Sequence, residues 1–96
     1  MSFVNQVPRI FNRVNILALN PGQNGVYGIY RQGLWIYIGK GDIRARLLAH
    51  IDGDNPAILR QNPTHWVDEV RADPHMSTRE KELILLCNPC CNQRIG

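Results

Sequence analysis

Two tyrosines ten residues apart, Tyr27 and Tyr37, occupy the most strand-like stretch of the chain. They belong to the short strings Gly25-Val26-Tyr27 and Tyr37-Ile38-Gly39. A phenol both donates and accepts hydrogen bonds, but with an ordinary pKa of about 10 it acts as a base only if neighbouring groups lower that value. The pair therefore gains chemical meaning only if both rings lie on one face of a sheet, close to charged groups.

Three charged or titratable residues later in the chain have the spacing to join such a pair. Arg46 and His50 are four residues apart in a predicted helix, so we expect them to lie together on the rim of its apolar face. Glu80 falls on the same helical face as Leu83, pointing inward. An inward carboxylate costs free energy unless a cation or hydrogen-bond donors satisfy it. A competing interpretation is that Glu80 closes a capping box with Ser77.

Residues 25–39 predict a β-hairpin, because two runs rich in Tyr, Ile, Val and Trp flank a Gln-Gly pair. Four glycines in this stretch are too many for a hairpin that only packs, so something approaches the backbone closely. A two-residue loop, Gln32-Gly33, would place the two tyrosines on opposite faces, whereas a three-residue loop beginning at Arg31 would place them opposite each other on one face. We expect the three-residue loop.

The remaining pattern predicts one α+β domain, a small three-stranded antiparallel sheet flanked by helices. Asp42 is a suitable N-cap for a helix over 43–51, and Ser77 opens a last helix that ends before Pro89. The other expected elements are a short helix near 8–18 with Ile10, Val14 and Leu17 on one face, a buried stripe of Ile43, Leu47 and Ile51, a short helix Pro56–Arg60 and a strand Thr64–Ala72. We divide the chain into a lead-in (1–24) packed on the domain, the domain itself (25–92) and a tail (93–96).

Composition favours a single globular domain with an uneven charge. The chain has 96 residues, of which 44% are hydrophobic and 20% charged. No apolar run approaches the roughly 20 residues of a membrane helix, and the N-terminus lacks the layout of a signal peptide, so we expect a cytoplasmic protein. Residues 1–51 hold six Lys or Arg and one acid, a charge of +5, and residues 52–96 hold five against seven, a charge of −2. This asymmetry suits a phosphate-rich partner, although an ordinary charged surface explains it equally well.

The three cysteines, Cys87, Cys90 and Cys91, gather near the C-terminus. Their odd number argues against a disulfide framework. Cys87 and Cys90 have zinc-ligand spacing, but the chain has no second CxxC or paired-His element, so buried free thiols are favoured over a zinc site.

Taken in order, these strings resemble the GIY-YIG nuclease superfamily over about residues 25–92. Gly25-Val26-Tyr27 is similar to the first signature and Tyr37-Ile38-Gly39 to the second, followed directly by Lys40 as in the repair branch. Arg46 and His50 are similar to the helix arginine of that family and the His or Tyr one turn later. The end of the chain is similar to its closing pattern E-x-x-L-I-x(4)-P-x-x-N, made here of Glu80, Leu83, Ile84, Pro89 and Asn92.

The resemblance implies a metal-dependent endonuclease that hydrolyses DNA by a single-metal mechanism, with RNA not excluded as a substrate. Glu80 would hold one Mg²⁺ or Mn²⁺, Tyr27 would act as general base or orient water, and Arg46 would clamp the phosphate. Tyr37 would contact the phosphate or water, and Lys40 would help to lower the pKa of Tyr27. His50 would donate to the phosphate or assist proton transfer, and Gly25, Gly39 and Asn92 would support the site.

Two other functions remain open from the sequence. A catalytically inactive nucleic-acid-binding module could share the fold, although it would not need an inward carboxylate. A small zinc-binding interaction domain could use the three cysteines. A core this small has little room to recognise a DNA sequence, so we expect a protein partner or separate domain to supply targeting.

Overall fold

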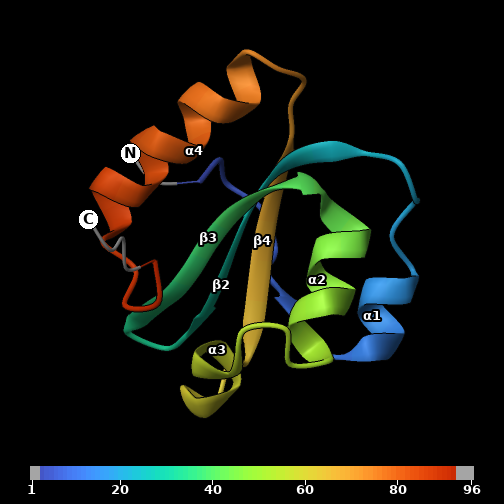
Figure 1. Cartoon of the computed structure of the whole chain (residues 1–96), viewed down its shortest axis with the longest axis vertical. Coiled ribbons are helices and arrows are strands. Elements are labelled where there is room, and N and C mark those ends of the chain that lie inside the picture. The colour runs from blue at the N-terminus through green and yellow to red at the C-terminus, as the bar shows by residue number, and fades with distance from the viewer. Residues whose placement is uncertain (1–2, 93–96) are drawn as a thin grey trace.

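The computed structural model describes residues 3–92, which form a four-stranded antiparallel sheet with helices on both faces (Figure 1). The strand order is β1-β4-β2-β3, so β3 lies at one edge. Along the chain the elements are β1 (Arg9–Ile10), α1 (Arg13–Leu17), β2 (Asn24–Arg31), β3 (Leu34–Asp42), α2 (Ile43–Ile51), α3 (Pro56–Arg60), β4 (His65–Val70) and α4 (His75–Cys87). The expected α+β class is confirmed, and the sheet has four strands where three were predicted.

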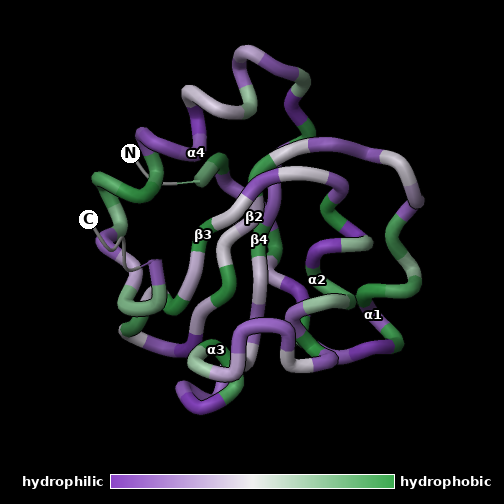
Figure 2. The backbone as a smooth tube through the Cα atoms, viewed as in Figure 1, coloured by the Kyte–Doolittle hydropathy of each residue, from purple (hydrophilic) through white to green (hydrophobic). Residues whose placement is uncertain are grey.

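Side chains alternate between two apolar layers, one on each face of the sheet, because successive strand residues point to opposite sides. On one face Tyr27, Ile29 and Trp66 pack against the helices α1, α2 and α3. On the other face Val26 and Ile38 pack against α4. Hydrophobic and hydrophilic residues accordingly alternate along the strands and helices (Figure 2). The two layers fix where α2 and α4 lie relative to the hairpin β2–β3, and both helices carry predicted site residues.

The predicted hairpin forms, but its predicted loop is wrong. Arg31 pairs with Leu34, so the loop is the two-residue Gln32-Gly33, with Gly33 at a φ of 79°. The register then shifts by one residue, because Ile29 pairs with Tyr37 and leaves Ile36 as the extra residue of a β-bulge. Tyr27 pairs with Gly39 rather than with Tyr37. The bulge nevertheless returns the Tyr37 side chain to the sheet face that carries Tyr27.

At three of the four hairpin glycines, the protein itself fills the space that a side chain would need. A Cβ on Gly39 would lie 2.3 Å from the Tyr27 hydroxyl, and one on Gly25 would lie 2.1 Å from the backbone oxygen of Glu69. A Cβ on Gly28 would meet the ring of Phe3 at 2.6 Å. The close approach inferred from glycine content is therefore real, but internal side chains and backbone occupy the space.

The lead-in differs from the single helix predicted over 8–18. Arg9 and Ile10 form β1, which pairs with Trp66 and His65 of β4. The helix that follows is only five residues long, and its buried residue is Ile16. The predicted face of Ile10, Val14 and Leu17 is exposed, because the strand interrupts the helical periodicity on which that prediction was based.

The other helices agree more closely with their predictions. Helix α2 begins after Asp42, whose side chain accepts a hydrogen bond from the N–H of Ala45. Its buried residues include Ile43 and Leu47, as predicted, but His50 is also buried, while Ile51 is half-buried. Helix α4 begins at His75, two residues before the predicted start, so Ser77 is not its N-cap and the capping-box interpretation of Glu80 is wrong.

The end of the described chain returns to the free edge of β3. The N–H groups of Cys90 and Cys91 donate to the carbonyls of Trp35 and Ile36, the two carbonyls at the bulge. The predicted tail, 93–96, lies outside the described residues. Within residues 3–92, none of the helices has the length and apolar character needed to traverse a lipid bilayer.

Candidate active site

The centre of the candidate site is a buried hydrogen bond between Tyr27 and His50. Tyr27 comes from β2 and His50 from the last turn of α2, and their Oη and Nε2 atoms are 2.7 Å apart. Both side chains are almost fully buried, with exposures of 0% and 1%. The prediction that His50 lies on a helix rim is wrong, because the helical wheel counts only apolar neighbours within α2 and not the phenol that β2 brings to it.

The turn after α2 adds a carboxylate that sequence reasoning missed. His50 Nδ1 is 2.8 Å from Asp54 Oδ1, and Arg46 Nη2 lies 3.3 Å from the other oxygen, Oδ2, of the same carboxylate. Arg46 also donates a hydrogen bond to the Tyr27 hydroxyl. The sequence prediction gives Asp54 no role, although the four-residue steps from 46 to 50 to 54 are a usable signal.

Tyr37 completes this cluster from β3. Its ring centroid is 6.3 Å from that of Tyr27 and 5.0 Å from that of His50, so both phenols lie on the same face of the sheet. Tyr37 is half-buried, whereas Tyr27 lies beneath it against Gly39. The groups that a ligand meets first are therefore Tyr37 and Arg46.

Burial sets the proton affinities of this cluster. Desolvation raises the pKa of Tyr27 above its ordinary value, and Tyr37 adds to the rise, while the hydrogen bond and charge of Arg46 oppose it. Burial lowers the pKa of His50 below 6.5, against the raising effect of the hydrogen bond and charge of Asp54. At neutral pH the cluster consequently holds a neutral phenol beside a neutral imidazole.

The remaining predicted residues approach from the α4 side of β3. Lys40 has the strand parity of Ile38, and its Nζ donates to Ser77 Oγ at 2.7 Å, so it does not join the tyrosine cluster. Asn92 holds the backbone of Ile38 from both sides, accepting from its N–H and donating to its carbonyl, each at 2.7 Å. Asn92 thus braces the strand residue that follows Tyr37.

Glu80 lies on α4, one turn after Ser77 and one turn before the half-buried Ile84. Within residues 3–92 the half-buried Glu80 carboxylate makes no hydrogen bond or ion pair. That part of the chain contains no group of three or more His, Cys, Asp or Glu arranged to hold a metal. A single accessible carboxylate fits a hard divalent cation that keeps most of its water shell, and it does not fit a cation that needs a full protein cage.

A second carboxylate, that of Glu69, is buried, and its burial was not predicted from the sequence. It is 5% exposed and accepts hydrogen bonds from Arg71, Arg79 and the N–H of Val4. Burial by itself raises the pKa of Glu69, but these donors outweigh it and the pKa lies below 4.5. Its strand parity with Val67 was a usable signal.

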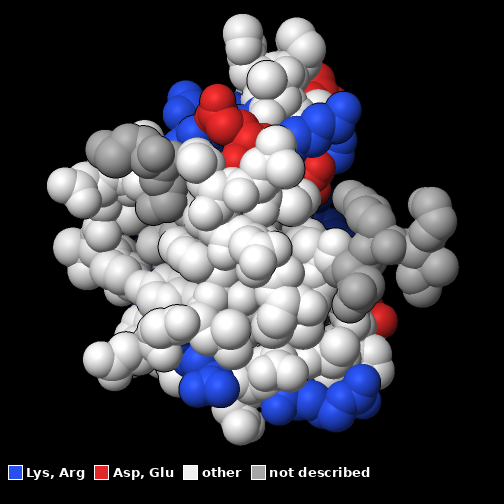
Figure 3. Space-filling view, turned by 90° about the vertical axis from the view of Figure 1, so that its left-hand side faces the viewer, with Lys and Arg blue, Asp and Glu red and all other residues white. Residues whose placement is uncertain are grey.

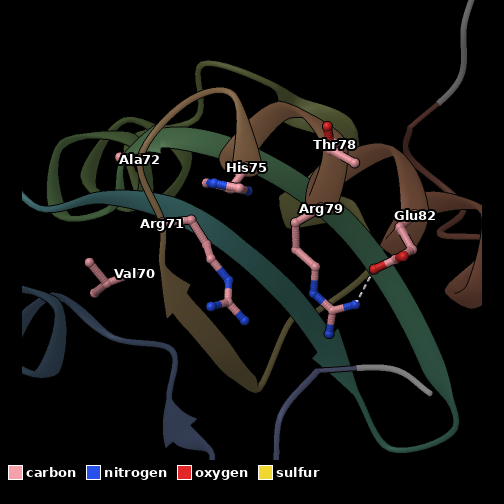
Figure 4. Close-up of a pocket in the computed structure, with 7 residues that line it drawn as sticks. All are labelled: Val70, Arg71, Ala72, His75, Thr78, Arg79 and Glu82. Atoms are coloured by element: carbon pink, nitrogen blue, oxygen red, sulfur yellow. Dashed lines mark hydrogen bonds and ion pairs between the residues drawn. The ribbon is translucent and has the colours of Figure 1, made fainter.

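A surface hollow of about 700 Å³ lies over this ion-pair cluster rather than over the tyrosines. Arg71 and Arg79 enter it side by side from β4 and α4, and Glu82 contacts Arg79 at its edge (Figure 4). None of the predicted site residues lines the hollow. Because both arginines are already bound to Glu69, we assign this region to the attachment of α4 and the N-terminal segment.

The three cysteines are free thiols, as predicted, but they are not fully buried. Cys90 is exposed, and Cys87 and Cys91 are half-buried. The Sγ atoms of Cys90 and Cys91 lie 3.7 Å apart, and all three thiols are free. Among the described residues, these thiols do not belong to any group of three or more ligands that could hold zinc.

Comparison with known proteins gives a fold match. A scan against protein-family models and a search of curated proteins found no match. A solved structure of the GIY-YIG N-terminal endonuclease domain of UvrC from Thermotoga maritima aligns with a TM-score of 0.74 and 27% sequence identity, over 85% of this chain and 94% of that chain. Another structure of that domain gives a TM-score of 0.73 and 28% identity with the same coverage. Both are point mutants bound to their catalytic divalent cation.

The similarity extends over most of both chains and includes the antiparallel sheet flanked by helices. It agrees with the signature strings, whose tyrosines meet on one sheet face beside the arginine and histidine of α2. The chain therefore belongs to the GIY-YIG nuclease superfamily.

Proposed function

We propose that this protein is a divalent-metal-dependent endonuclease that hydrolyses phosphodiester bonds of DNA. The observation that carries the proposal is the 2.7 Å hydrogen bond from Tyr27 to His50 within a cluster that also holds Tyr37 and Arg46. Structures of the UvrC domain with Tyr-to-Phe substitutions at two positions ten residues apart also hold the catalytic cation. Tyr27 and Tyr37 have the same spacing.

The proposed role of each residue in the cluster follows from how exposed its side chain is. Arg46, with 41% of its side chain exposed, neutralises charge on the scissile phosphate, and Tyr37 donates a hydrogen bond to it. Tyr27 accepts a proton from the attacking water as its own proton passes to Nε2 of His50. One P–O ester bond breaks when the water oxygen attacks phosphorus. The leaving oxygen takes a proton from solvent, and His50 returns its extra proton to solvent. Because the Tyr27 hydroxyl is buried, substrate binding must shift Tyr37 to admit the water.

Glu80 would hold the cation, Mg²⁺ or Mn²⁺, which when bound polarises the phosphate and stabilises charge on the leaving oxygen. Arg46 supplies the fixed positive charge from α2, which packs on the sheet face opposite to that of α4. Asn92 keeps Ile38, and with it the strand that carries Tyr37, in place. This arrangement corresponds to a single-metal mechanism, since Glu80 is the one residue assigned to the cation.

Nicking of supercoiled plasmid in Mg²⁺ or Mn²⁺ tests the proposal. The Glu80→Gln variant is expected to lose at least about 100-fold in rate. The matched control is Glu82→Gln on the same helix, because Glu82 is exposed and pairs with Arg79 outside the cluster. Equal cleavage rates for wild type and Glu80→Gln on DNA and RNA would refute the proposal that this protein is a metal-dependent nuclease.

A second candidate is a nucleic-acid-binding module without catalysis. The burial of the Tyr27 hydroxyl favours it, because a base sealed from solvent does not reach water. Salt-sensitive binding of DNA without cutting in either metal would establish this function instead. Titration of binding against salt in the same samples separates the two outcomes.

A further inference from the structure

We infer that Asp54 is a positioning residue that fixes the tautomer of His50, so that Nδ1 carries the hydrogen and Nε2 accepts the proton of Tyr27. The three side chains form a continuous chain from the turn after α2 to the middle of β2. The distances are 2.8 Å from Asp54 Oδ1 to His50 Nδ1 and 2.7 Å from His50 Nε2 to Tyr27 Oη. The tautomer is a property of the free protein, while its catalytic consequence rests on the proposed nuclease function.

The hydrogen-bonding chemistry of the three side chains determines which atoms carry the hydrogens. An ionised carboxylate only accepts hydrogen bonds, so the atom that faces Asp54 must carry a hydrogen. A neutral imidazole carries one hydrogen, which leaves Nε2 as an acceptor. The hydroxyl of Tyr27 then donates to Nε2, and its oxygen keeps lone pairs for Arg46 and for the proton of water.

Transfer of the Tyr27 proton creates an imidazolium and a phenolate. The carboxylate of Asp54 stabilises the imidazolium, and the guanidinium of Arg46 stabilises the phenolate. Asp54 also lies 3.3 Å from Arg46, so one carboxylate orients both the imidazole that takes the proton and the guanidinium that stabilises the phenolate. The side chain of Asp54 is 36% exposed, whereas the imidazole that it contacts is buried.

Four charged or titratable groups face His50 from the elements around it. They are Tyr27 on β2, Tyr37 on β3, Arg46 within α2 and Asp54 in the following turn. Asp54 raises the pKa of His50, whereas burial and Arg46 lower it. Substitution of Asp54 by Asn removes the raising contribution, so the pKa of His50 must fall further.

Nitrogen-15 NMR of the imidazole rings tests the tautomer directly. A His65→Gln, His75→Gln double variant leaves His50 as the one histidine of the chain. The expected spectrum has a protonated Nδ1 and an unprotonated Nε2, and Asp54→Asn in the same background is expected to lower the pKa and increase the Nε2–H form. A wild-type ring with hydrogen on Nε2, or no response to Asp54→Asn, would overturn the inference whether or not the protein cuts DNA.

The pH profile of nicking tests the catalytic consequence. Asp54→Asn is expected to reduce the rate by about 10- to 1000-fold and to move the acidic limb to lower pH, because His50 must be neutral to accept the proton. Asp52→Asn is the matched control, since Asp52 belongs to the same turn and pairs with Arg13 away from the cluster. A reduced rate with an unmoved acidic limb, or an equal effect of Asp52→Asn, would assign Asp54 a structural role only.

Discussion

Tyr27 is the side chain on which the candidate site depends. It packs over Gly39, donates to His50, accepts from Arg46 and lies beneath Tyr37. A fully buried phenol needs such partners, because an unpaired buried hydroxyl costs about 1–3 kcal/mol. The contacts that stabilise Tyr27 are therefore the same contacts that prepare it for proton transfer.

Replacement of Tyr27 by Phe separates these two roles. We expect nicking to fall by at least about 100-fold, because the proton acceptor is lost. Stability should fall by only about 1–3 kcal/mol, since the ring still packs and His50 loses one partner. Tyr30→Phe is the control, because the Tyr30 ring packs in a tilted contact against Trp35 on the opposite face. Parallel urea unfolding and nicking assays check both numbers, and equal nicking by the two variants would contradict the assignment.

Gly39→Ala tests the close approach to the phenol. The new Cβ would lie 2.3 Å from the Tyr27 hydroxyl and 2.8 Å from the Tyr37 ring, so both must move. We expect a loss of about 1–3 kcal/mol in the free energy of unfolding, together with loss of nicking. Gly33→Asn is the control, because its Cβ meets nothing within 4 Å and Asn tolerates a positive φ. Unchanged activity in Gly39→Ala would show that the phenol need not remain where it lies.

At the scale of elements, two attachments hold the catalytic face. Helix α2 is fixed through Ile43 and Leu47, and α4 through Met76 and Leu83 together with the ion pairs of Glu69. The boundaries of α2 were predictable, because Asp42 is a local N-cap signal that needs no tertiary context. The bulge, the burial of His50 and the role of Asp54 were not predicted, since each depends on contacts between distant elements.

Glu69 makes the attachment of α4 dependent on pH. Its pKa in the folded protein lies below its ordinary value of 4.5, so its contribution to stability is complete above 4.5 and is lost as the pH falls through the folded pKa. Glu69→Gln is expected to destabilise the protein by about 3–5 kcal/mol at neutral pH, because Arg79 loses its buried partner. It should also remove this part of the acid transition. Thermal unfolding from pH 7 to pH 3 measures both effects, and an unchanged acid transition would contradict them.

At the scale of the whole molecule, charge and apolar layers are separated. On the side covered by α4, charged residues gather at the two ends and the middle is uncharged (Figure 3). The fold rests on the two apolar clusters, which contain no residue proposed to bind a metal. The fold class was predictable because these clusters follow local hydrophobic patterns, whereas the meeting of residues 27, 46, 50 and 54 requires the assembled sheet.

Removal of divalent cations should consequently stop cutting without unfolding the protein. We expect EDTA to abolish nicking, and to shift Tm by less than about 2 °C, because a single carboxylate contributes little folding free energy through its metal. Circular dichroism melting with and without EDTA, followed by re-addition of Mg²⁺, checks this expectation. Unfolding in EDTA would instead indicate a structural metal.

The bulge at Ile36 has a consequence for how this hairpin tolerates insertions and deletions. A two-residue loop followed by regular pairing would place Ile36 opposite Ile29 and turn Tyr37 toward α4. The single extra residue is the step that returns Tyr37 to the side of Tyr27. Deletion of Ile36 would remove no side chain of the cluster and would still separate Tyr37 from it, whereas a hairpin loop longer by one residue would replace the bulge. The ten-residue spacing thus places both tyrosines on one face of the sheet either with a three-residue loop or with a two-residue loop and a bulge. This hairpin has the two-residue loop and the bulge.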